Sequence, residues 1–529
     1  MFGSKCLSPF VIGVVVLLGG ALGLSILVGL SSVVILAPSE FAVVVDAGSS
    51  HSEFLVYTWH PSKANISTRV YEAPKVEQVK FSCSTDKGIS MYDDPRDSAA
   101  SLQDCLTQAA SVIPANRRSQ TPVHLRATAG MRVLHENNPA KADAILNACL
   151  ALFLDSGLNG TTSSAEILPG SLEGGFGWIT ANYIQETILS KHSGKNTLGA
   201  LDLGGASTQI TFNDPSTFDS LSPQDKLRMQ LFGHEYFVYT HSYLCYGLNA
   251  ARQRLQTLAL SHLDTRREEA GFGEVKQGVV DLGRAVVPNP CLPKGYSVNL
   301  TADDVTTLRT DFCSRGVAFN ESIVAVTFVG TSDSDECQTL AEALVEDGQP
   351  PPRMGTGQPP VPTQQFFAFS GYYYLVDFLC SSRGVPECEP GKNNGWVLSP
   401  SGLRAATSRL CAETAAKLRD DTPSVPDKYL MDYCYQGHYV ASVLTSGYEF
   451  AHDTTQIEFV KDVDGKDVGW TLGYLLYDAT LESGAGTSHV VPMAGLLAGI
   501  VVSGLLLVFG VLLLYRAFKS HRSEYVRLN

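Results

Sequence analysis

Positive charge is scarce in this 529-residue chain. Lysine and arginine number 39 against 53 aspartates and glutamates, which leaves a formal net charge of −14 at pH 7. A protein that binds the nucleic-acid backbone needs a basic face opposite the phosphates. The composition therefore argues against nucleic acid as a partner. An acidic protein of this kind would hold an anionic ligand locally, through a cation and backbone N–H donors.

The chain also lacks a repeat of fixed period, which excludes a solenoid. Only one segment is of low complexity, the proline- and glycine-rich stretch 348–365, which predicts a linker or a surface loop. Elsewhere strand-like and helix-like patterns alternate, which favours an α/β fold. About 450 residues lie between two long apolar runs, too many for one ordinary core, so two lobes are expected.

Those apolar runs are Pro9–Leu36 and Val490–Tyr515, and both exceed the roughly 20 residues that cross a bilayer as a helix. The first is about twice as long as the apolar part of a cleavable signal peptide, which favours a retained anchor. Basic residues follow the second run, and the positive-inside rule assigns that end to the cytoplasm. We therefore expect cytoplasmic termini at 1–8 and 516–529, membrane helices at 9–37 and 490–515, and an ectodomain between them.

Small residues within the two runs offer faces for helix contact, at Gly19, Gly20, Gly495, Gly499 and Gly504. Such contacts could couple the helices to motion of the lobes of the ectodomain or join copies of the chain into a homo-oligomer. Plain anchoring in the membrane is the simpler interpretation. The membrane itself could be the plasma membrane or an internal one, because two spans do not identify it.

Four glycosylation sequons agree with an ectodomain in the secretory pathway: Asn65, Asn159, Asn299 and Asn320. Eleven of the twelve cysteines lie between the apolar runs, and disulfides persist in that compartment. Because eleven is odd, at least one thiol is left over or pairs outside the chain.

Cys149 is the candidate for a free thiol. Asn138 and Pro139 predict the start of a helix, with the asparagine as cap and the proline in the first turn. Cys149 then shares the apolar face of this helix with Ile145 and Phe153, which predicts a buried thiol rather than a reactive one.

One short phrase occurs twice. Residues 41–57 read FAVVVDAGSSHSEFLVY and residues 198–212 read LGALDLGGASTQITF. Each has an apolar run, an aspartate, a tight Gly/Ser turn and a second strand-like run, which predicts a β-hairpin. Backbone N–H groups and small hydroxyls in such turns bind phosphate. Asp46 and Asp202 beside them predict a metal–nucleotide site, gripped from two sides. Either turn alone would usually be an ordinary hairpin.

The hairpin pair resembles the actin-like ATPase superfamily, in which two lobes each present one phosphate-binding hairpin across a cleft. Three further segments extend the resemblance: ATAGMR at 127–132, SLEGGFGWITANY at 171–183 and FAFSGYYYLV at 367–376. In order, the five segments are similar to the apyrase signature regions. The chain resembles the ecto-nucleoside triphosphate diphosphohydrolases, in particular the cell-surface branch with a membrane span at each end. The similarity covers essentially the whole ectodomain.

The resemblance implies two actin-like (RNase H-like) lobes, residues 38–170 completed by 461–489 and residues 171–460, with the active site in the cleft between them. It implies removal of the terminal phosphate from extracellular ATP, ADP, UTP and UDP, ending at the monophosphate and requiring Ca²⁺ or Mg²⁺. Such an enzyme at the plasma membrane would terminate purinergic signals.

The resemblance also assigns roles to residues. Glu173 would be the general base that activates water, with Gln209 and Ser207 positioning that water. Asp46 and Asp202 would hold the metal, largely through its water shell. The phosphates would lie against Ser49, Ser50, His51, Thr128, Ala129, Gly204, Gly205 and Ala206. For Ser49, Ser50 and His51, ordinary turn hydrogen bonding is the alternative.

Tyr374 and Tyr429 would sandwich the nucleobase, a stacking that tolerates many bases. The alternative for Tyr372–Tyr374 is a buried aromatic strand. Leu248 and Asn249 stand where relatives often carry charged residues near the base, which leaves base preference open.

The resemblance implies the disulfides Cys83–Cys105, Cys245–Cys313, Cys291–Cys337 and Cys411–Cys434. Cys380 and Cys388 depart from the family pattern and could form a fifth bridge.

Two other classes of protein remain to be compared with a nucleotidase. A kinase or chaperone-type ATPase on the same fold is disfavoured by the scarcity of ATP outside cells and by the lack of a visible phospho-acceptor site. A catalytically silent receptor is disfavoured because Asp46, Glu173, Asp202 and Gln209 are all present.

Overall fold

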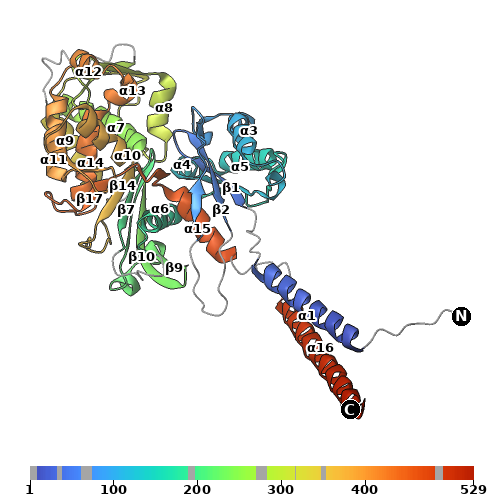
Figure 1. Ribbon diagram of the computed structural model, residues 1–529. Coiled ribbons are helices and arrows are strands. Elements are labelled where there is room, and N and C mark those ends of the chain that lie inside the picture. The colour runs from blue at the N-terminus through green and yellow to red at the C-terminus, as the bar shows by residue number, and fades with distance from the viewer. Residues whose placement is uncertain are drawn as a thin grey trace. The chain divides into compact units, whose positions relative to one another are not determined.

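The computed structural model describes residues 9–32, 39–60, 74–188, 197–269, 283–315, 317–346, 353–482 and 493–528. It contains two compact units (Figure 1). Unit 1 comprises Met1–Pro38 and Gly484–Asn529, and unit 2 comprises Ser39–Ser483. We describe each unit by itself.

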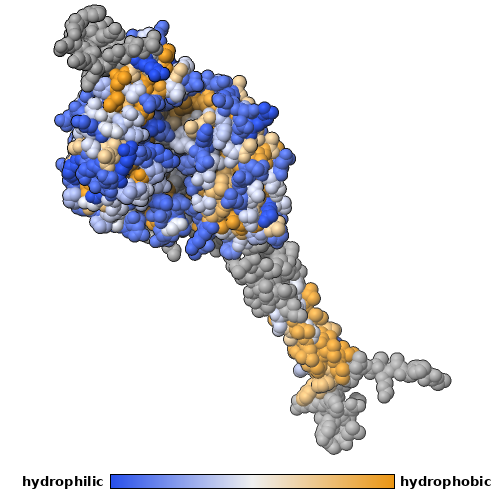
Figure 2. Space-filling view, turned by 90° about the horizontal axis from the view of Figure 1, so that it is seen from above, coloured by the Kyte–Doolittle hydropathy of each residue, from blue (hydrophilic) through white to orange (hydrophobic). Residues whose placement is uncertain are grey.

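Unit 1 consists of the helices α1 (Pro9–Ser32) and α16 (Met493–Leu528), whose surface is largely hydrophobic (Figure 2). Within the described residues, Gly499–Lys519 is the one helix long and apolar enough to cross a bilayer, with a mean hydropathy of 2.3. The apolar part of α1, Phe10–Ser25, is shorter. The first predicted span therefore remains a prediction. The helix α16 also continues through most of the predicted tail 516–529.

The two helices of unit 1 touch through glycines. A Cβ on Gly20 would lie 3.1 Å from Leu507 Cγ, and one on Gly13 would lie 3.0 Å from Leu514 Cγ. Gly19 and Gly504 do not lie at the contact between these two helices, because a side chain there would meet nothing within 4 Å, so their predicted role in helix contact is left to other copies of the chain and stays a prediction. Neighbouring helix positions point about 100° apart, so Gly20 faces the partner while Gly19 does not.

The first sheet of unit 2 has the strand order β3-β2-β1-β5-β6, with β4 paired to β2. Its strands are β1 (Glu40–Ala47), β2 (Ser52–Trp59), β3 (Val76–Gln78), β4 (Cys83–Ser84), β5 (Val123–Ala127) and β6 (Ala165–Ile167). Four helices accompany it, α2 (Pro95–Ala100), α3 (Gln103–Val112), α4 (Ala129–Asn137) and α5 (Pro139–Leu154). Asn138 caps α5 by accepting from the backbone N–H of Lys141, and Cys149 is buried and free, as predicted.

The second sheet has the order β15-β16-β17-β14-β7-β8-β10-β9. Its strands are β7 (Gly199–Leu203), β8 (Ser207–Asn213), β9 (Lys226–Leu231), β10 (His234–Leu244), β14 (Phe366–Ser370), β15 (Glu389–Pro390), β16 (Trp396–Val397) and β17 (Ile457–Phe459). The helices around it are α7 (Leu248–Glu269), α8 (Ala302–Thr310), α9 (Ser334–Glu346), α10 (Gly371–Asp377), α11 (Pro400–Cys411), α12 (Ala415–Asp421), α13 (Asp427–Leu430) and α14 (Tyr433–Ser442).

The two sheets share one local plan. In the first, β1 and β2 form an antiparallel hairpin and β1 runs parallel to β5. In the second, β7 and β8 form an antiparallel hairpin and β7 runs parallel to β14. Both predicted hairpins therefore exist, and each carries its aspartate near the end of the first strand.

Two helices lie between the sheets, α6 (Gly170–Ile184) and α15 (Trp470–Glu482) (Figure 1). A buried apolar cluster joins them to strands of both sheets. The glycine-rich run 174–177 lies within α6, where the absence of side chains on its glycines lets the helix approach its neighbours closely. A side chain on Gly473 would overlap the carbonyl of Phe176, so the two helix backbones touch.

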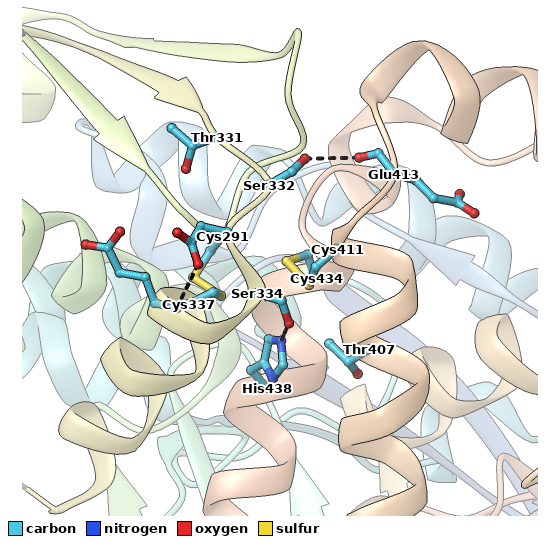
Figure 3. The surroundings of a disulfide bond; sticks show 12 residues. Cys291, Thr331, Ser332, Ser334, Cys337, Thr407, Cys411, Glu413, Cys434 and His438 are labelled. Carbon is cyan, nitrogen blue, oxygen red and sulfur yellow. Dashed lines mark hydrogen bonds between the residues drawn. A yellow bond between two sulfur atoms is a disulfide. The ribbon is translucent and has the colours of Figure 1, made fainter.

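A small sheet and two disulfides complete the second half of unit 2 (Figure 3). The small sheet has the order β11-β13-β12, from β11 (Arg284–Asn289), β12 (Ser297–Leu300) and β13 (Ala325–Gly330). Cys291–Cys337 joins the loop after β11 to α9, and Cys411–Cys434 joins α11 to α14. The other disulfides are Cys83–Cys105, Cys245–Cys313 and Cys380–Cys388, so all five bridges have the partners given above. Strands β18 (Asp462–Val463) and β19 (Lys466–Asp467) form a last short hairpin.

Candidate active site

The first hairpin presents its loop at the end of β1. Asp46 is the last residue but one of this strand and pairs in register with Glu53 of β2. Two glycines allow other segments to pack directly on the loop. A Cβ on Gly130 would lie 2.7 Å from the Cα of Ser49, and one on Gly88 would lie 2.6 Å from the carbonyl oxygen of Ser49. The backbone N–H of Thr128 donates to the carbonyl of Ala47. The segment 128–130 therefore lies against the first loop.

The second hairpin loop is held by the N-terminus of α7. The N–H groups of Asn249 and Ala250 donate to the carbonyl of Gly205, and that of Leu248 donates to the carbonyl of Gly204. The loop carbonyls thus point toward the helix. The N–H groups of Gly205 and Ala206 have no backbone acceptor among the described residues. Free N–H groups beside a helix N-terminus favour an anion such as phosphate.

The two loops meet. A side chain on Gly205 would overlap Ser49 Oγ, and Asn249 Nδ2 donates to Ser50 Oγ at 2.9 Å. The predicted phosphate-binding residues of both hairpins are therefore brought together from opposite sheets, although they lie far apart in the sequence. The space-filling view shows unit 2 hollowed between its two halves (Figure 2).

Glu173 lies in the first turn of α6, close to both loops, and is 6% exposed. Its Oε2 accepts from Arg132 Nη1 at 2.8 Å and from Gln209 Nε2 at 3.2 Å. The hydroxyl of Ser207 accepts from Arg132 Nη2 at 3.0 Å and from Gln209 Nε2 at 2.8 Å. Arg132 of α4 and Gln209 of β8 thus each bind both the carboxylate of Glu173 and the hydroxyl of Ser207.

These hydrogen bonds leave specific atoms free. The Oε1 of Glu173 accepts no hydrogen bond from the described residues, and the buried Oε1 of Gln209 has no partner either. Because Ser207 Oγ already accepts from Arg132 and Gln209, its own proton is available to a further acceptor. Two free acceptors and one free donor suit a water molecule that is held and deprotonated at this point.

Asp46 and Asp202 face the same region as Glu173. Burial raises the pKa of Asp46 well above its usual value, and the charges of Glu173, Glu53 and Asp202 add to the effect. Burial and Glu173 likewise raise the pKa of Asp202, to about 7. Asp46 Oδ2 accepts from Trp470 Nε1 at 3.1 Å, whereas its Oδ1 is buried without a partner. Crowded carboxylates with an unpartnered oxygen suit a hard divalent cation.

Among the described residues, no group of three or more His, Cys, Asp or Glu side chains is close enough to hold a metal. A cation between Asp46 and Asp202 would therefore keep most of its waters, as Mg²⁺ commonly does. The expectation that the two aspartates hold a metal largely through its water shell stays a prediction.

The predicted base-stacking residues are on the surface. Tyr374 is 57% exposed and Tyr429 is 48% exposed. The alternative of a buried aromatic strand at Tyr372–Tyr374 is wrong, because β14 ends at Ser370, whose φ of 57° breaks the strand, and α10 begins at Gly371. Of the three tyrosines only Tyr372 is buried. The Lys428 Nζ lies 4.7 Å from the centre of the Tyr429 ring.

Sequence reasoning missed several contributors to the site. Arg132 is the last residue of the segment ATAGMR, so its place in a signature segment could have pointed to it, although the resemblance assigns it no role. Trp470 lies in the segment VGWTLGY at 468–474, and nothing in its spacing shows that it reaches Asp46. Ser242 Oγ lies 3.0 Å from Gln209 Nε2 and shares the two protons of that amide with Glu173 and Ser207, and no motif marks it. Asn249 was noted only as a departure near the base.

Comparison with known proteins finds relatives along most of the chain. The sequence profile of the GDA1/CD39 (nucleoside phosphatase) family matches residues 36–484. Ectonucleoside triphosphate diphosphohydrolase 2 of Mus musculus is 35% identical over 451 residues, which cover 83% of this chain and 82% of that protein. Ectonucleoside triphosphate diphosphohydrolase 8 of Gallus gallus is 34% identical over 466 residues, 85% of each chain. Ectonucleoside triphosphate diphosphohydrolase 3 of Homo sapiens is 30% identical over 498 residues, 90% of this chain and 85% of that one.

A solved structure shares the fold. The crystal structure of nucleoside triphosphate hydrolases from Neospora caninum superposes with a TM-score of 0.58 at 16% sequence identity, covering 87% of this chain and 95% of that one.

Proposed function

Because the chain belongs to the GDA1/CD39 (nucleoside phosphatase) family, we propose that it is a nucleoside triphosphate diphosphohydrolase. It hydrolyses nucleoside tri- and diphosphates such as ATP, ADP, UTP and UDP to monophosphates. The three relatives above are named for this activity. The observation that carries the proposal is the pair of free acceptors, Glu173 Oε1 and Gln209 Oε1, beside the available proton of Ser207.

In the proposed mechanism a water molecule donates one hydrogen bond to each of those acceptors and directs an oxygen lone pair at the terminal phosphorus. Glu173 takes one proton as the water attacks. The carboxylate does not rotate away during this step because Arg132 and Gln209 hold Oε2. No covalent enzyme intermediate is needed, since phosphoryl transfer depends mainly on positioning and on stabilisation of charge.

The transferred phosphoryl group lies between the two hairpin loops. The free N–H groups of Gly205 and Ala206 donate to its oxygens from one side, and Ser49, Ser50 and His51 reach it from the other. Each well-placed donor that strengthens as charge develops contributes roughly 3 kcal/mol. Thr128 and Ala129 close the same subsite. Tyr374 and Tyr429 stack on the nucleobase, which admits several bases.

A divalent cation fits Asp46 and Asp202, because Asp46 Oδ1 is buried without a partner and both carboxyls have a raised pKa, through burial and through the charge of Glu173. Ca²⁺ or Mg²⁺ held by these two carboxylates would offset the negative charge of the phosphates. Trp470 orients Asp46 for this role.

The proposal includes a location. α16 anchors the chain in the plasma membrane, α1 is a second span, and unit 2 faces outward with both termini in the cytoplasm. The catalytic unit would then remove nucleotides from the extracellular space and end purinergic signals. The apolar segment Gly499–Lys519 supports the anchor, and the sequons support the outward face.

The test is phosphate release from ATP, ADP and AMP by intact cells that express the chain, with Ca²⁺ and then with EDTA. The expected result is release from ATP and ADP but not AMP, lost in EDTA. Glu173→Gln should abolish release while surface staining remains, because the amide cannot accept a proton. No release by wild type at normal surface levels would favour a silent receptor instead. Release that survives Glu173→Gln would remove this residue from the role of base.

A further inference from the structure

The small sheet β11-β13-β12 has one buried face and one open face. On the buried face Val287, Val326 and Phe328 are each at most 2% exposed and pack in an apolar cluster with residues of α7 and α8. On the open face the alternation of the strands places Val286, which is 46% exposed, and Val329, which is 38% exposed. The two exposed valines on adjoining strands form a small apolar patch, and β11 and β12 are the edge strands of this sheet.

The sequon Asn299-Leu300-Thr301 begins on this open face. Asn299 is exposed on β12 and is paired in register with Thr327 of β13, which is paired in turn with Val286 of β11. The three side chains therefore form one row across the sheet, about 10 Å from first strand to third. Val329 lies two residues along β13, on the same face.

The side chain of Asn299 is already oriented. Its Oδ1 accepts from Thr327 Oγ1 at 2.8 Å, while its amide nitrogen has no acceptor among the described residues. An N-linked sugar uses only the nitrogen, so this hydrogen bond persists after modification. Asn320 differs, because it is half-buried and its Oδ1 accepts from both the N–H and the hydroxyl of Ser322. Asn159 is exposed on a different segment, and Asn65 lies outside the described residues.

We propose that Asn299 carries an N-linked glycan that lies across the open face of the small sheet and covers Val286 and Val329. The amide nitrogen forms a bond to the anomeric carbon of a lipid-diphosphate-linked sugar and loses one proton. The bond from that carbon to the diphosphate oxygen breaks, and the lipid diphosphate leaves. The C–H faces of the first sugars rest on the valines, and the glycan blocks strand addition at the edge strand β12.

The proposal rests on the outward placement of unit 2 under "Proposed function", but not on its catalytic activity. The test expresses the full chain in a glycosylating eukaryotic host and maps the occupied asparagines by mass spectrometry of its peptides. Occupancy at Asn299 is expected. If Asn159 is occupied and Asn299 is not, the proposal is overturned. If no sequon is occupied, the outward placement fails together with the proposal, while phosphate release from detergent extracts would still report on catalysis separately.

Coverage of the valines is tested on one folded polypeptide. A variant with Asn65, Asn159 and Asn320 changed to Gln keeps only the glycan at Asn299, and an endoglycosidase that leaves a single sugar trims it under native conditions. Trimming should raise the aggregated fraction and the binding of a hydrophobic dye about twofold, because the patch becomes exposed. In Val286→Thr/Val329→Thr the rise should disappear. Val112→Thr, which alters a 39% exposed valine elsewhere, should leave it unchanged. An equal rise in all three proteins, or none in the parent, would refute coverage.

Discussion

Arg132 Nη1 lies 2.8 Å from Glu173 Oε2, and only 13% and 8% of the two side chains are exposed. The second nitrogen of the same guanidinium donates to the hydroxyl of Ser207. An arginine of α4 thus fixes the carboxylate of α6 and the hydroxyl of β8 in a single geometry. Its planar, forked donors suit this task better than the single ammonium of lysine.

Arg132→Met should lower kcat for ATP about 100-fold with a smaller change in KM, because the proposed base Glu173 and the hydroxyl of Ser207, proposed to position the water, both lose their orientation. Arg132→Lys should restore part of the activity. The measurement is steady-state phosphate release, normalised to folded protein. Arg383→Met is the matched control, since Arg383 makes a similar pair with Glu413 at 2.7 Å that lies outside the candidate site. An equal fall in kcat in the control would show that Arg132 acts only on folding.

Asn249→Ala should lower kcat/KM for ATP about fivefold, mainly through KM, because one hydrogen bond between the two proposed phosphate-binding loops is lost. The bond in question joins Asn249 Nδ2 to Ser50 Oγ. Asn137→Ala is the control, since Asn137 Nδ2 donates to Asp311 at 3.2 Å across the same two halves but away from the loops. Initial rates over a range of ATP concentrations separate the two variants. Indistinguishable KM values would argue against a role for Asn249 in positioning the loops.

Asp46→Asn should raise the melting temperature of the metal-free protein at pH 7 and also abolish metal-supported hydrolysis. The native pKa of Asp46 is raised by burial and by neighbouring carboxylates, so its charged form destabilises the fold above the ordinary carboxyl range. The gain in stability should shrink as the pH falls toward 4, where the aspartate is protonated. Asp94→Asn should do the opposite, because Arg96 lowers the pKa of Asp94. Melting temperatures measured in EDTA at several pH values test whether Asp46→Asn raises the melting temperature and Asp94→Asn lowers it.

His438 should make unit 2 less stable in mild acid. Burial lowers the pKa of this histidine to about 4, with Arg404 adding to the effect. The unfolded chain therefore binds a proton between about pH 6.5 and 4 that the folded chain does not, and stability falls across that window by about 2 kcal/mol at pH 5. His438→Gln should weaken the dependence of the free energy of unfolding on pH. Part of this dependence should remain in the variant, because the pKa of His124 is lowered in the same way. Denaturant midpoints of unfolding are compared at pH 5 and pH 7. If the midpoint of His438→Gln falls between pH 7 and pH 5 as much as that of the wild type, this account is contradicted.

Local pattern was sufficient for much of the fold. The two hairpins, the capped helix at Asn138 and the buried thiol of Cys149 all follow from residue order, because turn chemistry, capping and apolar periodicity act within a few residues. Pattern failed at Tyr372–Tyr374, where a strand passes into a helix at Ser370. Aromatic residues suit both elements, and the backbone conformation that ends the strand is not visible in composition.

The sequence by itself determined which chemistry this chain can contain: two Asp–turn hairpins, a glutamate before a glycine pair, and cysteines for five bridges. Only the tertiary structure decided which atoms of the candidate site remain available to bind a ligand or a water molecule. Arg132 and Gln209 both bind Oε2 of Glu173, so Oε1 is the free oxygen, and Asn249 joins loops from different sheets. These contacts connect positions from 36 to 199 residues apart. No short-range preference specifies them, because they depend on how two sheets pack around α6 and α15.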